Sequence, residues 1–270
     1  MSKPQGIAVV TGAASGMGHA AARLMSQAGW PLLLCDLNGE RLETAATELR
    51  GAGSVEALAG DLSDPAWPER LTAALAGRPL GALIHCAGLS PTMAGPGRIL
   101  EVNLAASIRL MDAVRPLIAE GGACVLFASS AGYMMGAAMD AQIGAVTTPE
   151  AVASLAAYAP ESGAAYSISK RGVHLLAQRE ALAFGRRGAR VVSVSPGIID
   201  TPMGRSEMAA QPIMKTMVDA SPLGRSARAE EVAAVAVFLC SPGASFISGV
   251  DVLVDGGSIA GMRAAGLAPA

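Results

Sequence analysis

Two side chains separated by three residues have the types and spacing that proton transfer needs. Tyr166 and Lys170 occur in the stretch Ala-Ala-Tyr-Ser-Ile-Ser-Lys. If Tyr166 lies in a helix, a residue four positions later lies on the same face, so the ammonium group can lie close to the phenol or to a ligand beside it. A nearby cation favours the phenolate and lowers a pKa that is about 10 in model peptides. The pair therefore predicts an acid/base centre, although either residue alone is more often a packing or surface side chain.

A glycine-rich turn follows the first apolar run, Ile7 to Val10, and reads Thr-Gly-Ala-Ala-Ser-Gly-Met-Gly. Its first glycine permits a tight turn, the second lets backbone amides approach a pyrophosphate, and the third lets the next helix pack closely. The N-terminus of that helix attracts phosphate charge. The turn therefore predicts a dinucleotide site, and the residues expected to contact the dinucleotide are Gly12, Ser15, Gly16, Met17 and Gly18.

An acidic residue ends the next apolar run. Asp36 directly follows Cys35. Its distance along the chain from the glycine turn is close to the one at which an acidic residue accepts hydrogen bonds from the adenosine ribose hydroxyls of a dinucleotide. A carboxylate at this place repels a 2′-phosphate, so Asp36 predicts NAD rather than NADP as the cofactor. Leu37, the next residue, is also expected to contact the cofactor. The alternative is that Asp36 only caps the helix that starts near Gly39.

Short apolar runs alternate with longer helical patterns, which is typical of a parallel sheet with crossover helices. We expect strands at 7–11, 31–35, 55–58, 82–85, 124–128, 190–194 and 251–254. We expect helices at 18–28, 39–49, 65–75, 100–119, 165–185 and 229–239. Right-handed crossovers would make this an α/β fold with a doubly wound, Rossmann-type, seven-stranded parallel sheet and helices on both faces. Its ligand would bind beyond the carboxyl ends of the strands.

The composition fits one domain over residues 1–270, because 51% of the side chains are hydrophobic and can fill one core. A formal net charge of −2 predicts no nucleic-acid partner and no binding to an anionic membrane. No apolar run suits a membrane span or a secretory signal, so we expect a cytoplasmic protein. The four scattered cysteines predict free thiols, and no metal site is expected.

Together and in order, these motifs resemble the single-domain branch of the short-chain dehydrogenase/reductase family over nearly the whole chain. Other segments are similar to further parts of the family pattern. Those segments are the adenine-contacting pair Asp61-Leu62, the small pair Ala87-Gly88 beside the cofactor, the nicotinamide turn with Pro196, Gly197, Ile199 and Thr201, and the closing strand Val254-Asp-Gly-Gly257.

The resemblance implies a role for each candidate catalytic residue. Tyr166 gives a proton to a carbonyl oxygen or takes one from an alcohol, and Lys170 lowers the pKa of that tyrosine and binds the nicotinamide ribose. Ser129 binds the substrate oxygen, with Ser130 as the fallback. Asn103 helps to hold an active-site water chain to the lysine. The reaction is then NAD-dependent hydride transfer that interconverts a secondary alcohol and a ketone.

Two departures from the family pattern stand out. His85-Cys86 replaces the usual Asn-Asn, so the hydrogen bonds of the sheet must be met otherwise, and His85 is expected to be structural. The long interval between Ser129 and Tyr166 predicts an inserted helical segment at about 133–162, with a helix over 149–158. This insertion loosely resembles bacterial 3α-hydroxysteroid dehydrogenase/carbonyl reductase. It implies an alicyclic or steroid-like substrate near Met134, Met135 and Met139, unless these methionines only fill the core.

Residues 198–223, which contain Pro202 and Pro212, predict a substrate lid that orders when a ligand binds. The resemblance also implies a homodimer or homotetramer. In the family the subunits commonly contact each other through the helix that carries the tyrosine, and the insertion could block or replace that contact. Two other functions are weighed. One is a redox-silent dinucleotide sensor on the same scaffold, which would be expected to lose the tyrosine, lysine or serine. The other is an NAD-dependent epimerase or dehydratase, which needs a larger C-terminal domain.

Overall fold

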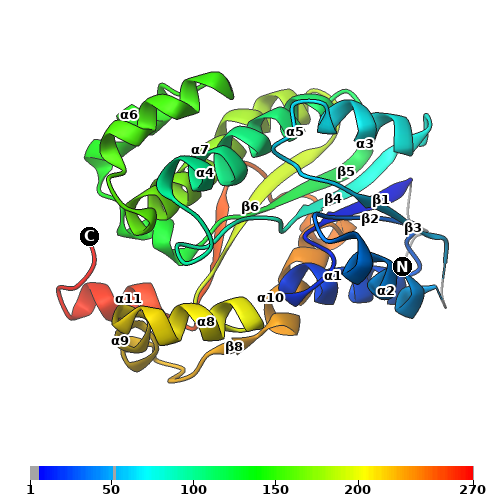
Figure 1. The fold of residues 1–270 in the computed structure, drawn as a ribbon. Coiled ribbons are helices and arrows are strands. Elements are labelled where there is room, and N and C mark those ends of the chain that lie inside the picture. Colours follow the sequence, from blue (N-terminus) through cyan, green and yellow to red (C-terminus); the bar gives the residue numbers. More distant parts are fainter. Residues whose placement is uncertain (1–5, 51–52, 270) are drawn as a thin grey trace.

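Seven parallel strands form the central sheet in the computed structural model, which describes residues 6–50 and 53–269 (Figure 1). Their order is β3-β2-β1-β4-β5-β6-β9, and every neighbouring pair is parallel. The predicted doubly wound sheet is confirmed. The chain order reverses between β1 and β4, which is where such sheets bind ligands beyond their carboxyl ends. The strands are β1 Ile7–Thr11, β2 Leu32–Asp36, β3 Val55–Ala59, β4 Leu80–His85, β5 Ile118–Phe127, β6 Arg190–Pro196 and β9 Asp251–Val254.

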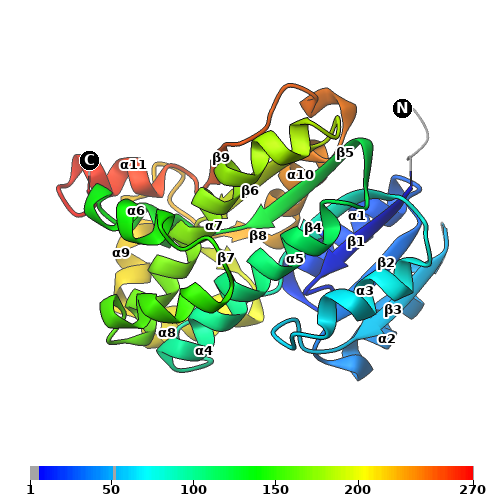
Figure 2. The same cartoon turned by 90° about the horizontal axis from the view of Figure 1, so that it is seen from above.

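Helices cover both faces of the sheet, because alternate side chains along each strand point to opposite faces (Figures 1 and 2). One face carries Val9 and packs against α3, α4, α5 and α7, and the other carries Ala8 and Val10 and packs against α1, α2 and α10. The central strand β1 is therefore buried on both sides. These helices are α1 Gly16–Gln27, α2 Gly39–Leu49, α3 Trp67–Leu75, α4 Pro96–Leu100, α5 Ala106–Val114, α7 Ser162–Gly185 and α10 Ala229–Leu239.

The helix expected over 100–119 is wrong in two respects. A π-helical turn, η1 (Glu101–Ala105), separates α4 from α5, and the helix ends at Val114. Pro116 has no N–H to continue the helical ladder, and the next residues already enter the sheet, since β5 begins at Ile118. The strand expected at 124–128 is therefore the second half of a longer one.

The segment between Ser129 and Tyr166 contains three short helices: η2 (Ser130–Met134), α6 (Ala137–Gly144) and η3 (Glu150–Tyr158). The expected helix at 149–158 is present with 3₁₀ geometry, and α6 was not expected. Both α6 and η3 contact α7.

Residues 198–223 contain β7 (Ile199–Asp200), α8 (Pro202–Ala210) and α9 (Pro212–Ala220). Each proline begins a helix, where its missing N–H costs nothing. β7 pairs with β8 (Ala227–Arg228), and the chain ends with η4 (Pro242–Ala244) and α11 (Ser258–Ala264). None of the helices within the described ranges has the length and apolar character to cross a bilayer.

Candidate active site

Ser129, Tyr166 and Lys170 meet where β5 ends. Ser129 follows β5 with extended backbone and hydrogen-bonds the hydroxyl of Tyr166 on α7. Lys170, one turn later, places Nζ 5.7 Å from the centre of the Tyr166 ring and donates a 2.9 Å hydrogen bond to the carbonyl of Phe127. Ser130 is buried next to Ser129, but it is Ser129 that reaches the phenol. The strand end and one helix face thus bring together a hydroxyl, a phenol and an amine.

Burial controls the ionisation of this cluster. It raises the pKa of Tyr166, the hydrogen bond from Ser129 opposes that rise, and the charge of Glu207 adds to it. Burial also lowers the pKa of Lys170 to about 8. The sequence predicted that Lys170 lowers the pKa of Tyr166. In this structure the net shift is upward, because burial dominates while the amine is directed to the Phe127 carbonyl.

Asn103 lies in the π-helical turn η1, and such turns often occur at functional sites. Its Oδ1 accepts a 2.7 Å hydrogen bond from the Leu89 amide, and its Nδ2 donates to the Leu89 carbonyl (2.9 Å) and to Ser169 Oγ (3.2 Å). A Cβ atom on Gly88 would lie 3.1 Å from Asn103 Oδ1 and 3.3 Å from Lys170 Nζ. The structure therefore brings Asn103 to the same place as Lys170.

His85 replaces the hydrogen bonds that the absent asparagines would make. Ala87 N–H donates to Thr11 Oγ1 (3.2 Å), Thr11 lies 2.7 Å from His85 Nδ1, and His85 Nε2 lies 2.9 Å from Ser107 Oγ. Ser107 donates to the carbonyl of Asn103 (2.8 Å), so the tautomer with the proton on Nε2 satisfies every member of the chain. Burial, with a smaller effect from Lys170, lowers the pKa of His85 to about 3. The ring is therefore neutral and structural, as expected.

The glycine turn has the geometry of a phosphate cradle. Gly16 has φ of +56°, a conformation that favours glycine, and a Cβ on Gly18 would lie 2.1 Å from the Gly12 carbonyl oxygen. Side chains at these positions would fill the space that brings the backbone close to a pyrophosphate. Ser15 is exposed and lies at the N-cap position immediately before α1, and Met17 packs against the core. The residues present fit a dinucleotide.

Asp36 faces this turn. Its Oδ2 accepts a 3.1 Å hydrogen bond from the Ala14 amide, and its Oδ1 accepts a 3.0 Å bond from the Asn38 amide. The alternative role as a helix cap is wrong, because Asn38 caps α2 by accepting from the Arg41 amide at 3.0 Å. Leu37 is exposed beside it.

The remaining cofactor candidates lie around the same edge. The carboxylate of Asp61 binds Arg98 (2.5 Å), and Leu62 packs in the core. Pro196 ends β6, and the amide of Gly197 donates to the Val254 carbonyl (3.0 Å). Ile199 lies in β7. Thr201 caps α8 by accepting from the Gly204 amide (3.0 Å), and its methyl carbon would lie 3.6 Å from a Cβ on Gly16. Of the methionines expected near the substrate, Met135 and Met139 pack against the core.

Sequence reasoning missed Glu207, a residue of α8. Its side chain is buried and accepts hydrogen bonds from Ser90, Thr92 and Gln211. Ser90 and Thr92 belong to the loop after β4, far away in sequence. Nothing in the local sequence distinguishes this glutamate from a solvated helix residue, so only the folded chain reveals it.

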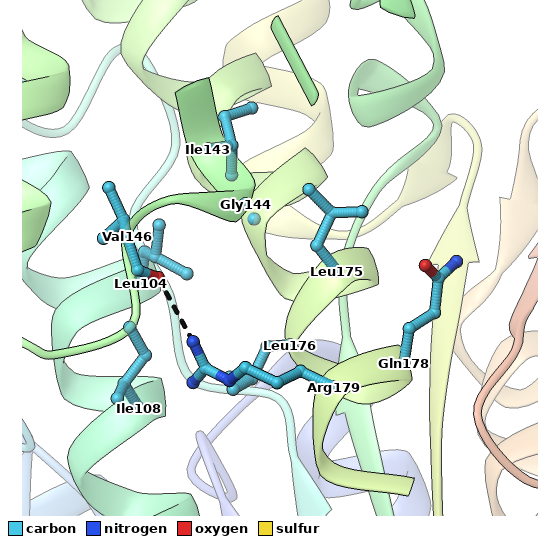
Figure 3. Close-up of a pocket in the computed structure, with 10 residues that line it drawn as sticks. Leu104, Ile108, Ile143, Gly144, Val146, Leu175, Leu176, Gln178 and Arg179 are labelled. Atoms are coloured by element: carbon cyan, nitrogen blue, oxygen red, sulfur yellow. Dashed lines mark hydrogen bonds between the residues drawn. The ribbon is translucent and has the colours of Figure 1, made fainter. Parts of the chain in front are cut away.

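A cavity of about 380 Å³ lies away from this cluster, between the inserted segment and the helices beneath it (Figure 3). Apolar side chains predominate in its lining, and Arg179 closes one end by donating a 3.2 Å hydrogen bond to the Val146 carbonyl (Figure 3). The lining contains neither Tyr166 nor Lys170, so this cavity is not the proton-transfer site. It is lined by Leu104, Ile108, Ile143, Gly144, Val146, Gly172, Leu175, Leu176, Gln178 and Arg179.

A doubly wound sheet with a phosphate cradle at its switch point and a Ser-Tyr-Lys cluster beside it defines a dinucleotide-dependent oxidoreductase. Two family models match the sequence: "short chain dehydrogenase" over residues 6–145 and "Enoyl-(Acyl carrier protein) reductase" over 133–258. The chain belongs to the short-chain dehydrogenase/reductase family. It is therefore an oxidoreductase of the CH–OH group of alcohols, or of the matching ketones, that uses a nicotinamide dinucleotide.

Three relatives place the chain within this family. Cyclohexanol dehydrogenase of Acinetobacter sp. (strain SE19) is 32% identical, with 93% of both chains covered. The structure of 3-alpha-hydroxysteroid dehydrogenase from Pseudomonas sp. B-0831 complexed with NADH has a TM-score of 0.78 at 32% identity, covering 96% of this chain and 98% of that one. The Pseudomonas aeruginosa RhlG/NADP complex has a TM-score of 0.76 at 26% identity, covering 95% and 97%. The similarity to 3α-hydroxysteroid dehydrogenases is thus confirmed.

Proposed function

We propose that the protein is an NAD-dependent dehydrogenase that interconverts a secondary alcohol and a ketone of alicyclic or steroid-like type. The observation that carries this proposal is the hydrogen-bonded pair Ser129–Tyr166 with Lys170 one turn away. The similarity to cyclohexanol and 3-alpha-hydroxysteroid dehydrogenases supports the substrate class.

In this proposal each side chain has one task. NAD would be held by the glycine turn and Asp36, and when bound it would supply the hydride chemistry between a secondary alcohol and a ketone. Tyr166 takes the proton of the alcohol oxygen during oxidation and returns it during reduction. Ser129 fixes that oxygen by a hydrogen bond. Lys170 keeps a positive charge close to the phenol at neutral pH, and Asn103 holds Leu89 and Ser169 beside the lysine.

The preference for NAD rests on Asp36. Its carboxylate is held at the end of β2 by two backbone amides, where the resemblance places the adenosine ribose. A 2′-phosphate there would meet the carboxylate charge, which disfavours NADP. Similar structures hold NADH in one case and NADP in another, so the preference must be measured on this chain.

A spectrophotometric screen of cyclic alcohols and ketones, including cyclohexanol and 3α-hydroxysteroids, tests the proposal with NAD and NADP in parallel. We expect turnover of at least one cyclic alcohol, with NAD preferred. Tight NAD binding without turnover of any alcohol or ketone would instead indicate a redox-silent sensor.

We also propose that α8 and α9 form a lid over the substrate and that the protein is a homodimer or homotetramer. Exposed Met203, Met208 and Ile213 give the lid apolar side chains that a bulky substrate could contact.

Because α6 and η3 already contact α7, we expect the subunit contact to involve other surfaces as well. Light scattering of the purified protein tests the assembly.

A further inference from the structure

A buried carboxylate with no role in the proposed reaction lies close to the catalytic tyrosine. The side chain of Glu207 belongs to a residue only 5% exposed. Its Oε1 accepts from Ser90 Oγ (2.5 Å), from the Thr92 amide (3.0 Å) and from the Thr92 hydroxyl, and its Oε2 accepts from Gln211. All of these donors are neutral. Within the part of the chain that the structure describes, no salt bridge joins Glu207 to a lysine, arginine or histidine.

These hydrogen bonds fix the carboxylate between the proposed lid and the catalytic elements. Glu207 comes from α8, whereas Ser90 directly follows Leu89, whose amide and carbonyl are held by Asn103. The same loop is tied to the start of α7, because Ser162 Oγ donates to the Ala94 carbonyl at 2.9 Å. The loop that holds Glu207 is therefore anchored to the helix that carries Tyr166. The negative charge of Glu207 raises the pKa of the Tyr166 phenol.

Neutral donors satisfy the oxygens of a carboxylate without cancelling its charge, so its field extends into the surrounding low-dielectric space. A substrate bound at Tyr166 under the lid shares that space. A second negative charge on the substrate would be repelled, while a neutral group of the same size would not. At the effective dielectric constant of such sites, one charge several ångströms away changes a rate ratio by roughly tenfold or more.

Resting on the proposed function, we propose that Glu207 is a specificity-determining residue that selects uncharged cyclic alcohols and ketones against those carrying a carboxylate. The charge of Glu207 acts on the bound substrate, and the residue transfers no proton. Its effect is to restrict the substrates of this active site to uncharged ones.

A matched pair of substrates tests this inference: 4-hydroxycyclohexanecarboxamide and 4-hydroxycyclohexanecarboxylate, which have the same ring and nearly the same size. We expect the wild-type protein to have a kcat/KM at least roughly tenfold higher for the amide. Glu207→Gln keeps an oxygen that accepts from Ser90 and Thr92 but removes the charge, so the ratio should fall by about tenfold. Thr92→Val removes one hydroxyl donor and keeps the charge, so the ratio should stay at the wild-type value.

Three outcomes would overturn the inference. These are a wild-type ratio near one, a ratio unchanged in Glu207→Gln, and a ratio that falls as far in Thr92→Val as in Glu207→Gln, which would assign the selection to the hydrogen bonds of the lid. If Glu207→Gln does not fold, a wild-type ratio near one still overturns the inference.

A binding measurement separates this inference from the proposed function. Calorimetry of the NAD-loaded protein with cyclohexanecarboxamide and cyclohexanecarboxylate needs no turnover, and we expect the amide to bind at least tenfold more tightly. Equal affinities overturn the role of Glu207. Failure of every alcohol to react, with the affinity difference intact, counts against the proposed reaction alone.

Discussion

The two sides of the crevice are built in different ways. On the nucleotide side, β1, β2 and α1 are regular elements, and the cradle between them is shaped by backbone and glycines, with Asp36 held by two amides. On the proposed substrate side, residues 130–162 and 198–223 form short helices. Glu207 of α8 accepts a hydrogen bond from Ser90 in the distant loop after β4, and Asn103 of η1 holds the same loop at Leu89. In the proposed function, backbone geometry therefore binds the dinucleotide, whereas side chains from separate segments select the substrate.

The largest expected effect lies on the catalytic cluster between the two sides. Tyr166→Phe removes the proton that the substrate oxygen exchanges, so kcat should fall by about a thousandfold. The affinity for NAD, measured by calorimetry, should change by less than about twofold, because the cradle is untouched. Tyr158→Phe is the matched control, since among the described residues the hydroxyl of this exposed tyrosine hydrogen-bonds only Gln142, and it should retain activity. Equal losses in both variants would contradict the assignment.

Cofactor choice should respond to the nucleotide side alone. Asp36→Ala removes the carboxylate that repels a 2′-phosphate, so the NAD-over-NADP ratio of kcat/KM should fall by roughly tenfold or more. Substituting Glu40, an acidic residue of the first turn of α2, by Ala should leave the ratio unchanged. A ratio that is the same in the wild type and in Asp36→Ala would place cofactor selection elsewhere.

The stability of the fold in acid should depend on His85, which joins Thr11 of β1 to Ser107 of α5 by hydrogen bonds. The pKa of His85 is about 3 in the folded protein and about 6.5 in an unfolded chain, so below pH 6.5 the unfolded state binds a proton that the folded state does not. The free energy of unfolding should therefore fall as the pH drops from 6.5 toward 3. His174, with a pKa lowered to about 4 chiefly by burial, adds to the same trend.

Urea unfolding at pH 7 and pH 4.5 measures this dependence. His85→Asn should lose about 2 kcal/mol less than the wild type between the two values, whatever its stability at pH 7. Identical losses in the wild type and in His85→Asn would show that this ring is not the acid-sensitive group.

The smallest effect concerns the proposed lid. Trypsin should cut after Arg205 or Lys215, whose side chains are 63% and 76% exposed, more slowly when NAD and substrate are present, by about threefold to tenfold. Cleavage after Arg41 in α2 and after Arg50 at its end, on the nucleotide side, provides an internal control. Equal rates with and without ligands would remove the lid proposal.

Sequence patterns predicted the regular strands and helices well because hydrophobic period and glycine spacing describe the backbone directly. β1, α2, α10 and β9 have the predicted bounds. The patterns were less informative where a contact decides the structure. The apolar run around Ile118 predicts the end of a helix, but it pairs with β4 in the sheet. α6 was missed because its small residues carry no clear amphipathic period. Glu207 was missed because its partners lie more than a hundred residues away.

The π-helical turn at Glu101–Ala105 joins α4 to α5 and fixes how far the side chains of one are rotated about the helix axis relative to those of the other. Because each residue of an α-helix rotates the chain by about 100°, one residue more or fewer rotates everything on one side of the change relative to the other. If Asn103, Leu104 and Ile108 keep their places, deleting Glu101 or Val102 would rotate α4 by about 100° and turn the buried Ile99 and Leu100 away from the core. Insertions and deletions that a surface loop would absorb are therefore forbidden in these five positions.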